Sequence, residues 1–540
     1  MTAASSGRAE PPATYVAPSL LAEAEQHPNA KLRVIVESRN TAAAAESAVA
    51  STGGLRDGGA IRRRLGIVKG ISITLRAKWI ARLATIPGLA VTPDVQVRQT
   101  GFSSTQLWPY GSGNAFLWRP IDTWRPASLP TIAVIDSGID ETNPGLAGRV
   151  VASVDLASST PNSPGDGRGH GTFVAGIAAG AAPGYSGAAP GAKLVSVDVL
   201  DDNGMAWTSD VIAAADWVLQ HKDDYGIRVA NFSLTASTPS SFTVDPLDKA
   251  VERLWFAGVV VVAAAGNDGQ GAADVVKYAP ANDPFVITVG AADLRGTASP
   301  ADDLAAPWSA YGYTFDGFRK PELGAPGRYL IGPVPPTAAL TTERPENVVA
   351  PGYMQLSGTS FAAPVVSGAA AHILALHPGY TPDQVKGALM VTARPVASTD
   401  WSLGVGEVNA VRAATFPDPP NPNAALRPFV AGSGFDVDGW LAAVQADASW
   451  NGASWNAASW NSAAWDSASW NAASWNAASW NSAAWDSASW NSASWNSAAA
   501  DAAVERDAEG DALPDGYPLT PEAADELRSD PFLQPLTPLP

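Results

Sequence analysis

The sequence predicts an α/β protein in which a mostly parallel β-sheet is flanked by helices and preceded by a small α+β domain. Three observations predict this class. Short, nearly continuous apolar runs recur between residues 131 and 289, helical stretches lie between and after them, and residues 31–98 follow a separate pattern of strands and helices. At roughly 100–200 residues per domain, the 540 residues are sufficient for about three domains and a large buried core.

The small N-terminal domain is expected over residues 31–100. Its expected elements are strands at 32–36 and 90–97, helices at 41–50 and 78–84, and one or two strands within 65–75, broken at Gly70. This order over some 70 residues is typical of an α+β domain. Residues 1–30 are expected to be disordered, because the chain begins with an Ala/Ser/Pro-rich stretch.

The main domain is expected over residues 101–430. Its expected strands are 131–135, 194–199, 229–233, 259–264 and 286–289, and its expected helices are 171–182, 209–221, 246–256 and 361–377. The strand segments are rich in Val and Ile, and such continuous runs fit strands that are buried on both faces of a parallel sheet. Functional groups in sheets of this kind lie at the carboxyl ends of the strands.

The net charge of −18 is unevenly distributed along the chain. Residues 1–100 carry 13 Lys and Arg against 7 Asp and Glu (+6), residues 101–430 carry 19 against 30 (−11), and residues 431–540 carry 2 against 15 (−13). An acidic body argues against a nucleic acid partner, because phosphate binding needs clustered Lys and Arg. The basic first segment and the acidic body could attract each other, or the acidity could simply keep the protein soluble.

The absence of cysteine excludes a disulfide framework, a thiolate metal site and a cysteine nucleophile. No uninterrupted apolar run approaches the roughly 18 residues that a membrane-spanning helix needs, so no transmembrane segment is expected. The first residues, MTAASSGRAEPPATYVAP, lack the charged start and the apolar core of a secretory signal.

Three short segments place chemically capable residues where a sheet of this class carries its active site. Asp136 ends an apolar run, and His170 and Ser360 each stand at the start of a helical stretch. Serine is a weak nucleophile until a base removes its proton, and a histidine base needs a carboxylate to fix its tautomer. Taken singly, the Asp could be a turn residue and the Ser a helix cap, but the three segments in this order favour a catalytic set. The histidines that lack glycines on both sides are expected to be surface or packing residues: His27, His221, His372 and His377.

The segments around these residues resemble those of the subtilisin-like serine proteases, the subtilase family, over about residues 130–415. They are Ala133-Val-Ile-Asp-Ser-Gly-Ile-Asp140, Gly167-Arg-Gly-His-Gly-Thr-Phe-Val-Ala-Gly176 and Ser357-Gly-Thr-Ser-Phe-Ala-Ala-Pro364. By this resemblance, Asp136 orients the histidine, His170 is the general base and acid, and Ser360 is the nucleophile. A fourth segment, Ala263-Ala-Ala-Gly-Asn-Asp-Gly269, resembles the family's oxyanion-hole segment and implies that the Asn267 side chain and the Ser360 N–H stabilise the oxyanion.

The substrate-binding residues that the resemblance implies come from three segments. Ser233, Leu234 and Thr235 resemble the strand that pairs with an extended substrate, and Ala264, Ala265 and Gly266 would line the other side of the primary specificity pocket. The family often has Gly where this chain has Thr235, which leaves the pocket depth open and could narrow specificity. Trp207 could accept an apolar substrate side chain at a more distant subsite, or it could cap the helix that follows.

Residues 31–98 resemble the inhibitory propeptide of the family. The resemblance implies folding assistance, intramolecular inhibition and self-cleavage between Val97 and about Thr105; the alternative is a permanent accessory domain. The family is mostly secreted, which conflicts with the missing signal segment, and its chemistry requires no cofactor. Structural calcium is common in the family, but no ligand cluster in this sequence is clear enough to name, and no metal-binding residue is predicted.

Ten of the 20 Trp recur at every fifth residue from Trp450 to Trp495, within a linker and repeat segment expected over residues 431–500. Residues 455–471 are repeated unchanged at 475–491, so a period of 20 overlies the period of five. Four five-residue sides per coil would align the Trp in a small solenoid; alternatively, the segment is a low-complexity repeat without a fixed fold.

Residues 501–540, with 10 acids and 2 bases, are expected to be a solvated, Pro-rich tail.

These observations predict a serine endopeptidase made as a self-processing zymogen, which hydrolyses protein or peptide substrates through an acyl-enzyme and is secreted. The Trp row could bind a glycan or another surface polymer, pack on the main domain or assemble with other copies. The alternative function is therefore a surface- or polymer-binding protein whose Trp repeats carry the mature role and whose protease domain serves processing.

Overall fold

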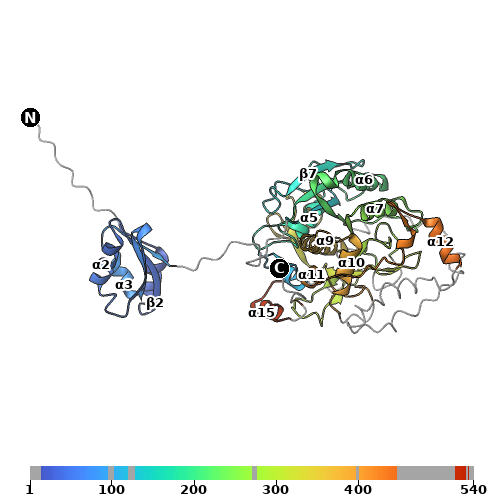
Figure 1. The fold of residues 1–540 in the computed structure, drawn as a ribbon. Coiled ribbons are helices and arrows are strands. Elements are labelled where there is room, and N and C mark those ends of the chain that lie inside the picture. Colours follow the sequence, from blue (N-terminus) through green and yellow to red (C-terminus); the bar gives the residue numbers. More distant parts are fainter. Residues whose placement is uncertain are drawn as a thin grey trace, which may run out of the picture. The chain divides into compact units, whose positions relative to one another are not determined.

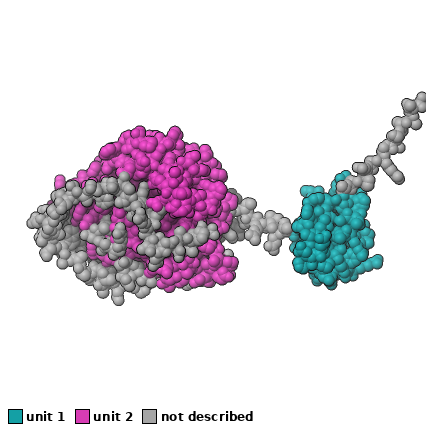
Figure 2. All heavy atoms as spheres, turned by 180° about the vertical axis from the view of Figure 1, so that it is seen from behind, with its two compact units in different colours: residues 1–100 teal, residues 101–540 magenta. Residues whose placement is uncertain are grey.

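The computed structural model describes residues 14–94, 103–118, 128–269, 276–396, 401–446, 517–530 and 533. The chain forms two compact units, residues 1–100 and residues 101–540, which are coloured teal and magenta in Figure 2. Each unit has its own hydrophobic core.

The small unit contains a five-stranded sheet and, among its described residues, three α-helices (Figure 1, blue). Its strands are β1 (Tyr15–Val16), β2 (Lys31–Ser38), β3 (Ala60–Leu65), β4 (Gly70–Arg76) and β5 (Leu89–Pro93); its helices are α1 (Pro18–Gln26), α2 (Ala42–Thr52) and α3 (Lys78–Leu83), with a 3-10 turn η1 (Gly66–Val68). The strand order is β1-β5-β2-β4-β3. Val34 and Val36 on β2 pair with Ile73 and Ile71 on β4, and all four are fully buried, so alternate residues of these strands form the core.

The start of the small unit differs from the expectation that residues 1–30 are disordered. Within that range, β1 pairs with β5, and α1 buries Leu20 and Ala24 against the core. Pro18 at the first helical position is tolerated, because the first N–H groups of a helix have no partner within it. The Ala- and Pro-rich composition concealed a helix whose apolar residues are spaced by four.

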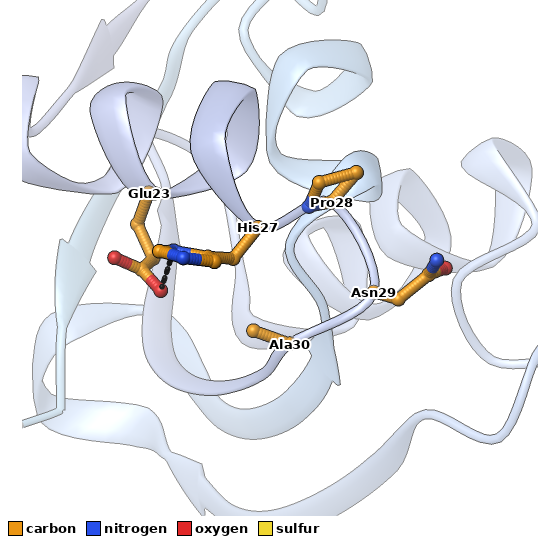
Figure 3. Close-up of a pocket in the computed structure, with 5 residues that line it drawn as sticks. All are labelled: Glu23, His27, Pro28, Asn29 and Ala30. Atoms are coloured by element: carbon orange, nitrogen blue, oxygen red, sulfur yellow. Dashed lines mark hydrogen bonds and ion pairs between the residues drawn. The ribbon is translucent and has the colours of Figure 1, made fainter.

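An open depression on the small unit is lined by Glu23, His27, Pro28, Asn29 and Ala30 (Figure 3). His27 Nδ1 lies 3.1 Å from Glu23 Oε1, and the His27 side chain is 62% exposed. An exposed pair of this kind contributes little free energy. The prediction that His27 is a surface residue is confirmed.

The larger unit is built around an eight-stranded sheet (Figure 1). Its strands are β6 (Thr131–Asp136), β7 (Val150–Asp155), β8 (Leu194–Asp198), β9 (Ile227–Phe232), β10 (Val260–Ala264), β11 (Ile287–Asp293), β12 (Leu304–Ala305), β13 (Gly312–Tyr313), β14 (Arg319–Lys320), β15 (Leu323–Pro326), β16 (Leu330–Pro333), β17 (Val348–Ala350), β18 (Tyr353–Leu356), β19 (Val430–Ala431) and β20 (Gly434–Phe435). Its helices are α4 (Trp108–Gly111), α5 (His170–Ala179), α6 (Thr208–Tyr225), α7 (Pro246–Phe256), α8 (Ala339–Glu343), α9 (Thr359–Leu376), α10 (Pro382–Val391), α11 (Ala410–Ala414), α12 (Val437–Ala446) and α15 (Pro521–Ser529), with 3-10 turns η2 (Asn114–Leu117), η3 (Pro345–Asn347) and η4 (Arg427–Phe429).

The order of the main sheet is β12-β11-β10-β9-β6-β8-β7, and β15 also pairs with β11. All pairings in it are parallel except that of β11 with β12. The five apolar runs of the sequence form β6, β8, β9, β10 and β11, and every residue of these strands except Arg228 on β9 is buried. The predicted α/β class with a mostly parallel sheet is confirmed.

Helices cover both faces of this sheet. α5 and α9 pack on each other, and α9 runs through the interior of the unit against β9, β10 and β11 (Figure 1). α6 and α7 pack on each other on the other face (Figure 1). Gly368 lets α9 approach its neighbours closely, since a Cβ there would lie 2.3 Å from the Cβ of Ala188.

Among the described helices, only α9 has the length and apolar composition of a membrane span. Its residues are 89% buried inside the protein, so its apolar character is that of a core helix. Buried residues on all sides are what a central helix requires.

Two expected boundaries of the main domain move outward. Beyond residue 430, α12 buries Trp440 against the rings of Phe242 and Phe318, so the folded body continues to this helix. Within 501–540, α15 buries Ala523, Ala524 and Leu527, although the segment was expected to be solvated. The predictions for the Trp repeats, Trp450 to Trp495, lie outside the described residues.

Candidate active site

Asp136 ends β6 in the middle of the sheet, between β8 and β9. It is fully buried, and its Oδ1 accepts a hydrogen bond from the N–H of Ser137 at 2.9 Å. A buried carboxylate needs such donors, because it has lost its water. The next residue but one, Gly138, has φ +91°, and a Cβ there would lie 1.9 Å from the carbonyl oxygen of Gly165.

His170 is the first residue of α5, after Gly169, which has φ +94°. Its Nδ1 lies 2.7 Å from Asp136 Oδ1, and its side chain is 20% exposed. Because the carboxylate accepts, the proton of the neutral imidazole is held on Nδ1, and Nε2 keeps its lone pair. Gly171 allows this approach, since a Cβ there would lie 2.1 Å from the carbonyl oxygen of Gly138. The predicted Asp136–His170 pair is therefore present in the structure.

Ser360 is the second residue of α9, and α9 packs on α5. The ring of Phe361 lies 5.3 Å from the ring of His170 and 4.4 Å from that of Phe173, measured between centroids. These contacts bring the start of α9 to the start of α5. In this conformation Ser360 Oγ donates a hydrogen bond to the carbonyl oxygen of Ser233 at 3.2 Å.

Pro364 explains how Ser233 holds the start of α9. A regular helix would bond the N–H of residue 364 to the carbonyl of Ser360, but proline has no N–H. The Ser233 hydroxyl donates to that carbonyl instead, at 2.7 Å. Asn231 donates in turn to Ser233 Oγ at 2.8 Å and accepts from Ser367 of α9 at 2.9 Å. The serine segment is thus tied to the end of β9.

Asn267 follows β10 and is fixed by its own carbonyl. Its Oδ1 accepts from both the N–H and the Oγ1 of Thr359, each at 3.0 Å, while Thr359 Oγ1 accepts from the N–H of Gly266 at 3.1 Å. The side-chain amide is therefore oriented by the residue next to Ser360. Its NH₂ group is a donor beside the Ser360 segment, as an oxyanion hole requires.

The residues expected to bind substrate lie at the ends of β9 and β10. Ser233, Ala264 and Ala265 are buried, Leu234 is partly buried and Thr235 is exposed. The side chains of Thr235 and Ala310 lie near Gly266, since a Cβ there would be 4.0 Å from Thr235 Cγ2 and 3.6 Å from Ala310 Cβ. Thr235 at the end of β9 and Gly266 after β10 are therefore neighbours, and their role in substrate binding stays a prediction.

Trp207 stands directly before α6 and is 65% exposed. In the loop that precedes it, Gly204 lies against Arg168, because a Cβ on Gly204 would be 3.3 Å from Arg168 Nε. Arg168 is two residues from His170 and forms an ion pair with Glu343 at 2.8 Å. The loop before Trp207 therefore borders the histidine segment.

Asp166 is a further residue that supports the site and was not predicted from the sequence. It is buried, and its two carboxylate oxygens accept from the N–H of Gly169 at 2.6 Å, from the N–H of Thr172 at 2.7 Å and from Ser137 Oγ at 2.8 Å. Burial raises the pKa of Asp166 to about 6, although its hydrogen bonds oppose this. Asp166 ties the first turn of α5 to the residue after Asp136. Its glycine-rich surroundings, which are typical of a loop, gave no signal of this role in the sequence.

Asp198 is a second buried acid near the Asp136–His170 pair, since it ends β8 next to Asp136. Burial raises the pKa of Asp198 to about 7, opposed by Asn162 and helped by the charges of Asp155, Asp166 and Asp136. Within the described ranges, no three or more His, Cys, Asp or Glu side chains are arranged to hold a metal ion.

Residues 128–410 match the model of a protein family described as the subtilase family, which is more than half of the chain. The chain belongs to this family and is a subtilisin-like serine endopeptidase. The fold and the Asp136–His170 pair described above agree with this membership.

Serine protease AprX of Bacillus subtilis (strain 168) is 37% identical over 290 residues, which are 52% of this chain and 65% of that protein. Subtilisin NAT of Bacillus subtilis subsp. natto is 31% identical over 399 residues, 73% of this chain and 94% of the relative. A crystal structure of a cold adapted subtilisin-like serine proteinase is 30% identical, with a TM-score of 0.40, over 52% of this chain and 90% of that one. The chain thus spans slightly less than two thirds of the first relative and nearly all of the second.

Proposed function

We propose that this protein cleaves peptide bonds with Ser360 as nucleophile, His170 as general base and acid, Asp136 as the orienting carboxylate and Asn267 as an oxyanion donor. The observation that carries this proposal is the 2.7 Å bond from His170 to the buried Asp136, at a helix start that packs on the helix start bearing Ser360. It fixes the tautomer that a base needs.

The reaction follows from these positions. His170 Nε2 takes the proton of Ser360 Oγ as that oxygen attacks the carbonyl carbon of the substrate, and the new oxyanion accepts from Asn267 Nδ2 and the Ser360 N–H. The bond to nitrogen breaks as His170 gives the proton to the leaving amine. Water then attacks the acyl-enzyme, with His170 again as base, and releases the acid and Ser360.

Replacing the nucleophile tests this proposal. Ser360→Ala is expected to lower kcat on a peptide substrate by roughly a millionfold, the loss known for the nucleophile of subtilisin. Ser299→Ala, in a loop outside the site, is the matched control and should keep wild-type activity. Retained hydrolysis by the Ser360 variant would rule out the assigned nucleophile.

The small unit is proposed to be an inhibitory propeptide that the protease removes from itself. Its support is the compact unit at residues 1–100, before the catalytic unit, and the opposite net charges of the two segments. Mass spectrometry of freshly folded protein should give a wild-type N-terminus between Val97 and about Thr105. The Ser360→Ala chain should keep its full length, and its processing would contradict self-cleavage.

The substrates are proposed to be proteins or peptides in an extracellular setting. One relative carries the name extracellular serine proteinase, which supports this location. Mass spectrometry of the culture medium of a producing strain tests it, because the mature chain should be found there. Finding it only inside cells would overturn the location while leaving the chemistry intact.

The Trp repeats are proposed to add a polymer-binding role to the protease. Their support is the row of ten Trp at a fixed spacing, since aromatic rings can stack on flat polymer surfaces. Deleting residues 450–499 should abolish binding to insoluble glycans and leave peptide hydrolysis unchanged. Unchanged glycan binding would remove this role.

A further inference from the structure

The chain returns to the catalytic unit after the Trp repeats. Leu107 N–H donates to the carbonyl of Tyr517 at 2.8 Å, and Leu519 N–H donates to the carbonyl of Thr105 at 2.7 Å, with Gln106 opposite Pro518 in antiparallel register. Residues 517–519 therefore form an antiparallel β-bridge with residues 105–107. We call residues 517–533 the C-terminal clasp.

Residues 103–107, which the clasp covers, are also bonded to the catalytic unit on their other side. Thr105 N–H donates to the carbonyl of Gly184 at 2.9 Å, and Ser186 N–H donates to the carbonyl of Ser103 at 3.2 Å. The Gln106 side chain bonds both the N–H and the carbonyl of Ile331, at 2.7 and 3.0 Å. Residues 103–107 thus lie between the clasp and the body of the catalytic unit.

Tyr517 fixes the clasp through its side chain. Its hydroxyl donates to Asp293 Oδ1 at 2.6 Å, and Asp293 Oδ2 accepts from Arg328 at 2.7 Å. The ring packs edge-on against that of Tyr329, with centroids 5.5 Å apart. Gly296 makes room, since a Cβ there would lie 3.0 Å from the Tyr517 ring. Burial, and then the bond to Asp293, raises the pKa of Tyr517, so the hydroxyl keeps its proton.

The helix of the clasp buries one face. Thr520 caps α15 by accepting from the N–H of Ala523 at 3.1 Å. Its apolar residues Ala523, Ala524 and Leu527 are buried, and α15 contacts α4. Leu533, beyond the end of the helix, is 1% exposed. Its acids point to solvent: Glu522, Asp525 and Glu526. The acids of α15 thus lie on its exposed side, and its apolar residues lie on its buried side.

We propose that the clasp is a built-in partner for the first residues of the mature protease, and that it anchors the chain to the catalytic unit after the Trp repeats, as α12 does before them. The first anchor is α12 with Trp440, and the second is the clasp. The part of this proposal that concerns the mature N-terminus rests on the proposed maturation cleavage. The part that concerns anchoring by the clasp stands without it.

The proposed maturation cleavage, between Val97 and about Thr105, explains why such a partner is useful. It leaves the residues that pair with the clasp next to a new chain end, and chain ends that nothing ties down are opened and digested readily. Antiparallel pairing with residues 517–519 satisfies the backbone of this end, so that it cannot extend into an active site as a substrate would.

Anchoring by the clasp is tested in the Ser360→Ala full chain, which cannot digest itself. A recognition sequence for a site-specific protease is inserted after Ala499, the folded protein is cut, and the fragments are separated by gel filtration. The C-terminal fragment is expected to stay with the body. The double variant Tyr517→Ala/Leu527→Asp is expected to release at least ten times more of it, whereas Glu526→Gln, an exposed acid of α15, should behave as the parent.

Release of the parent fragment as complete as that of the double variant would overturn anchoring by the clasp. The cut is made after folding, so a folding defect cannot produce this result. The mature N-terminus is tested separately in the active chain by mass spectrometry. Deleting residues 517–540 should trim the N-terminus beyond Thr105, and an untrimmed N-terminus would overturn the protective role. A chain that does not process itself would instead count against the proposed zymogen.

Discussion

The Asn267 side chain is oriented through its oxygen, which accepts from Thr359. In the proposed mechanism, its NH₂ group donates to the oxyanion. Asn267→Ala is expected to lower kcat by about 10²–10³ with little change in KM, the range measured on subtilisin itself, because the donor acts mainly in the transition state. Steady-state kinetics on a peptide substrate checks this.

Thr359 supplies the matched control for that experiment. Thr359→Ser keeps the hydroxyl that orients Asn267 and should retain most of the activity, whereas Thr359→Val removes it and should lower kcat to an intermediate value. If Asn267→Ala raised KM and left kcat unchanged, the side chain would bind substrate rather than stabilise the oxyanion.

At the residue scale, Asp166 is also expected to make the free energy of unfolding depend on pH. Its folded pKa of about 6 lies above the ordinary value of 3.8. Between about pH 4 and pH 6 the folded chain therefore holds a proton that the unfolded chain has lost, and the free energy of unfolding should fall as the pH rises through this window. The charge of Asp166 also raises the pKa of Asp198, so the two titrations are linked.

Unfolding by denaturant at several pH values, in the Ser360→Ala background, measures this slope. Asp166→Asn should flatten it, lower stability by about 1–3 kcal/mol and slow hydrolysis in the active chain, because α5 loses acceptors at its first turn. Asp223→Asn, on an 89% exposed acid, should keep the slope. An Asp166→Asn slope equal to the parent's would contradict the assignment.

The contrast between Asp136 and Asp166 shows what the sequence can and cannot predict about single residues. Asp136 follows an apolar run, and the position alone places it at a strand end. Asp166 stands in Gly165-Asp-Gly-Arg-Gly169, a composition typical of loops, and its partner Ser137 is 29 residues away. The fold alone brings the two together.

At the scale of elements, the start of α9 depends on a hydrogen bond from outside the helix. Pro364 has no N–H for the carbonyl of Ser360, and the Ser233 hydroxyl donates to that carbonyl instead. Ser233→Ala leaves the carbonyl of Ser360 without its donor and should cost about 1–3 kcal/mol of stability. Pro364→Ala adds the missing N–H, so the double variant should recover part of this loss. A double-mutant cycle of unfolding free energies in the Ser360→Ala background tests the coupling. Strictly additive effects would show that the two groups do not compensate each other.

His372, also on α9, should make the stability of the folded protein depend on pH in the acidic range. Burial lowers its pKa to about 4, opposed by its bond to the carbonyl of Ala188. The unfolded chain takes up a proton near pH 6.5 that the folded chain refuses, so stability should fall by on the order of 3 kcal/mol from pH 6.5 to pH 4. His372→Gln should reduce this loss, and the exposed His27→Gln should not. Equal losses in both variants would contradict the role of His372.

Two strands, β3 and β7, were not predicted from the sequence, and the physical reason is the same for both. β3 carries three Arg in a row and has no fully buried residue, and β7 is only partly buried at the sheet edge. Edge strands lack the apolar pattern that identifies central ones. The central strands β6, β9 and β10 were predicted, because both of their faces are buried.

At the scale of the whole molecule, the charge distribution predicts how salt affects the proposed inhibition. The first 100 residues carry +6 and residues 101–430 carry −11. Freshly processed protein should therefore gain activity as ionic strength rises to about 1 M, where the screening length is about 3 Å, because the released segment then dissociates faster. The same protein freed of its propeptide is the control, and an equal gain in both would show that salt acts elsewhere.

The most direct test of the central claim, that Ser360 is the nucleophile activated by His170, is covalent labelling with a fluorophosphonate followed by peptide mapping. One adduct is expected, on Ser360, formed in step with the loss of peptidase activity and absent from a His170→Ala chain. Loss of activity with the adduct on another residue, or with Ser360 unmodified, would contradict it.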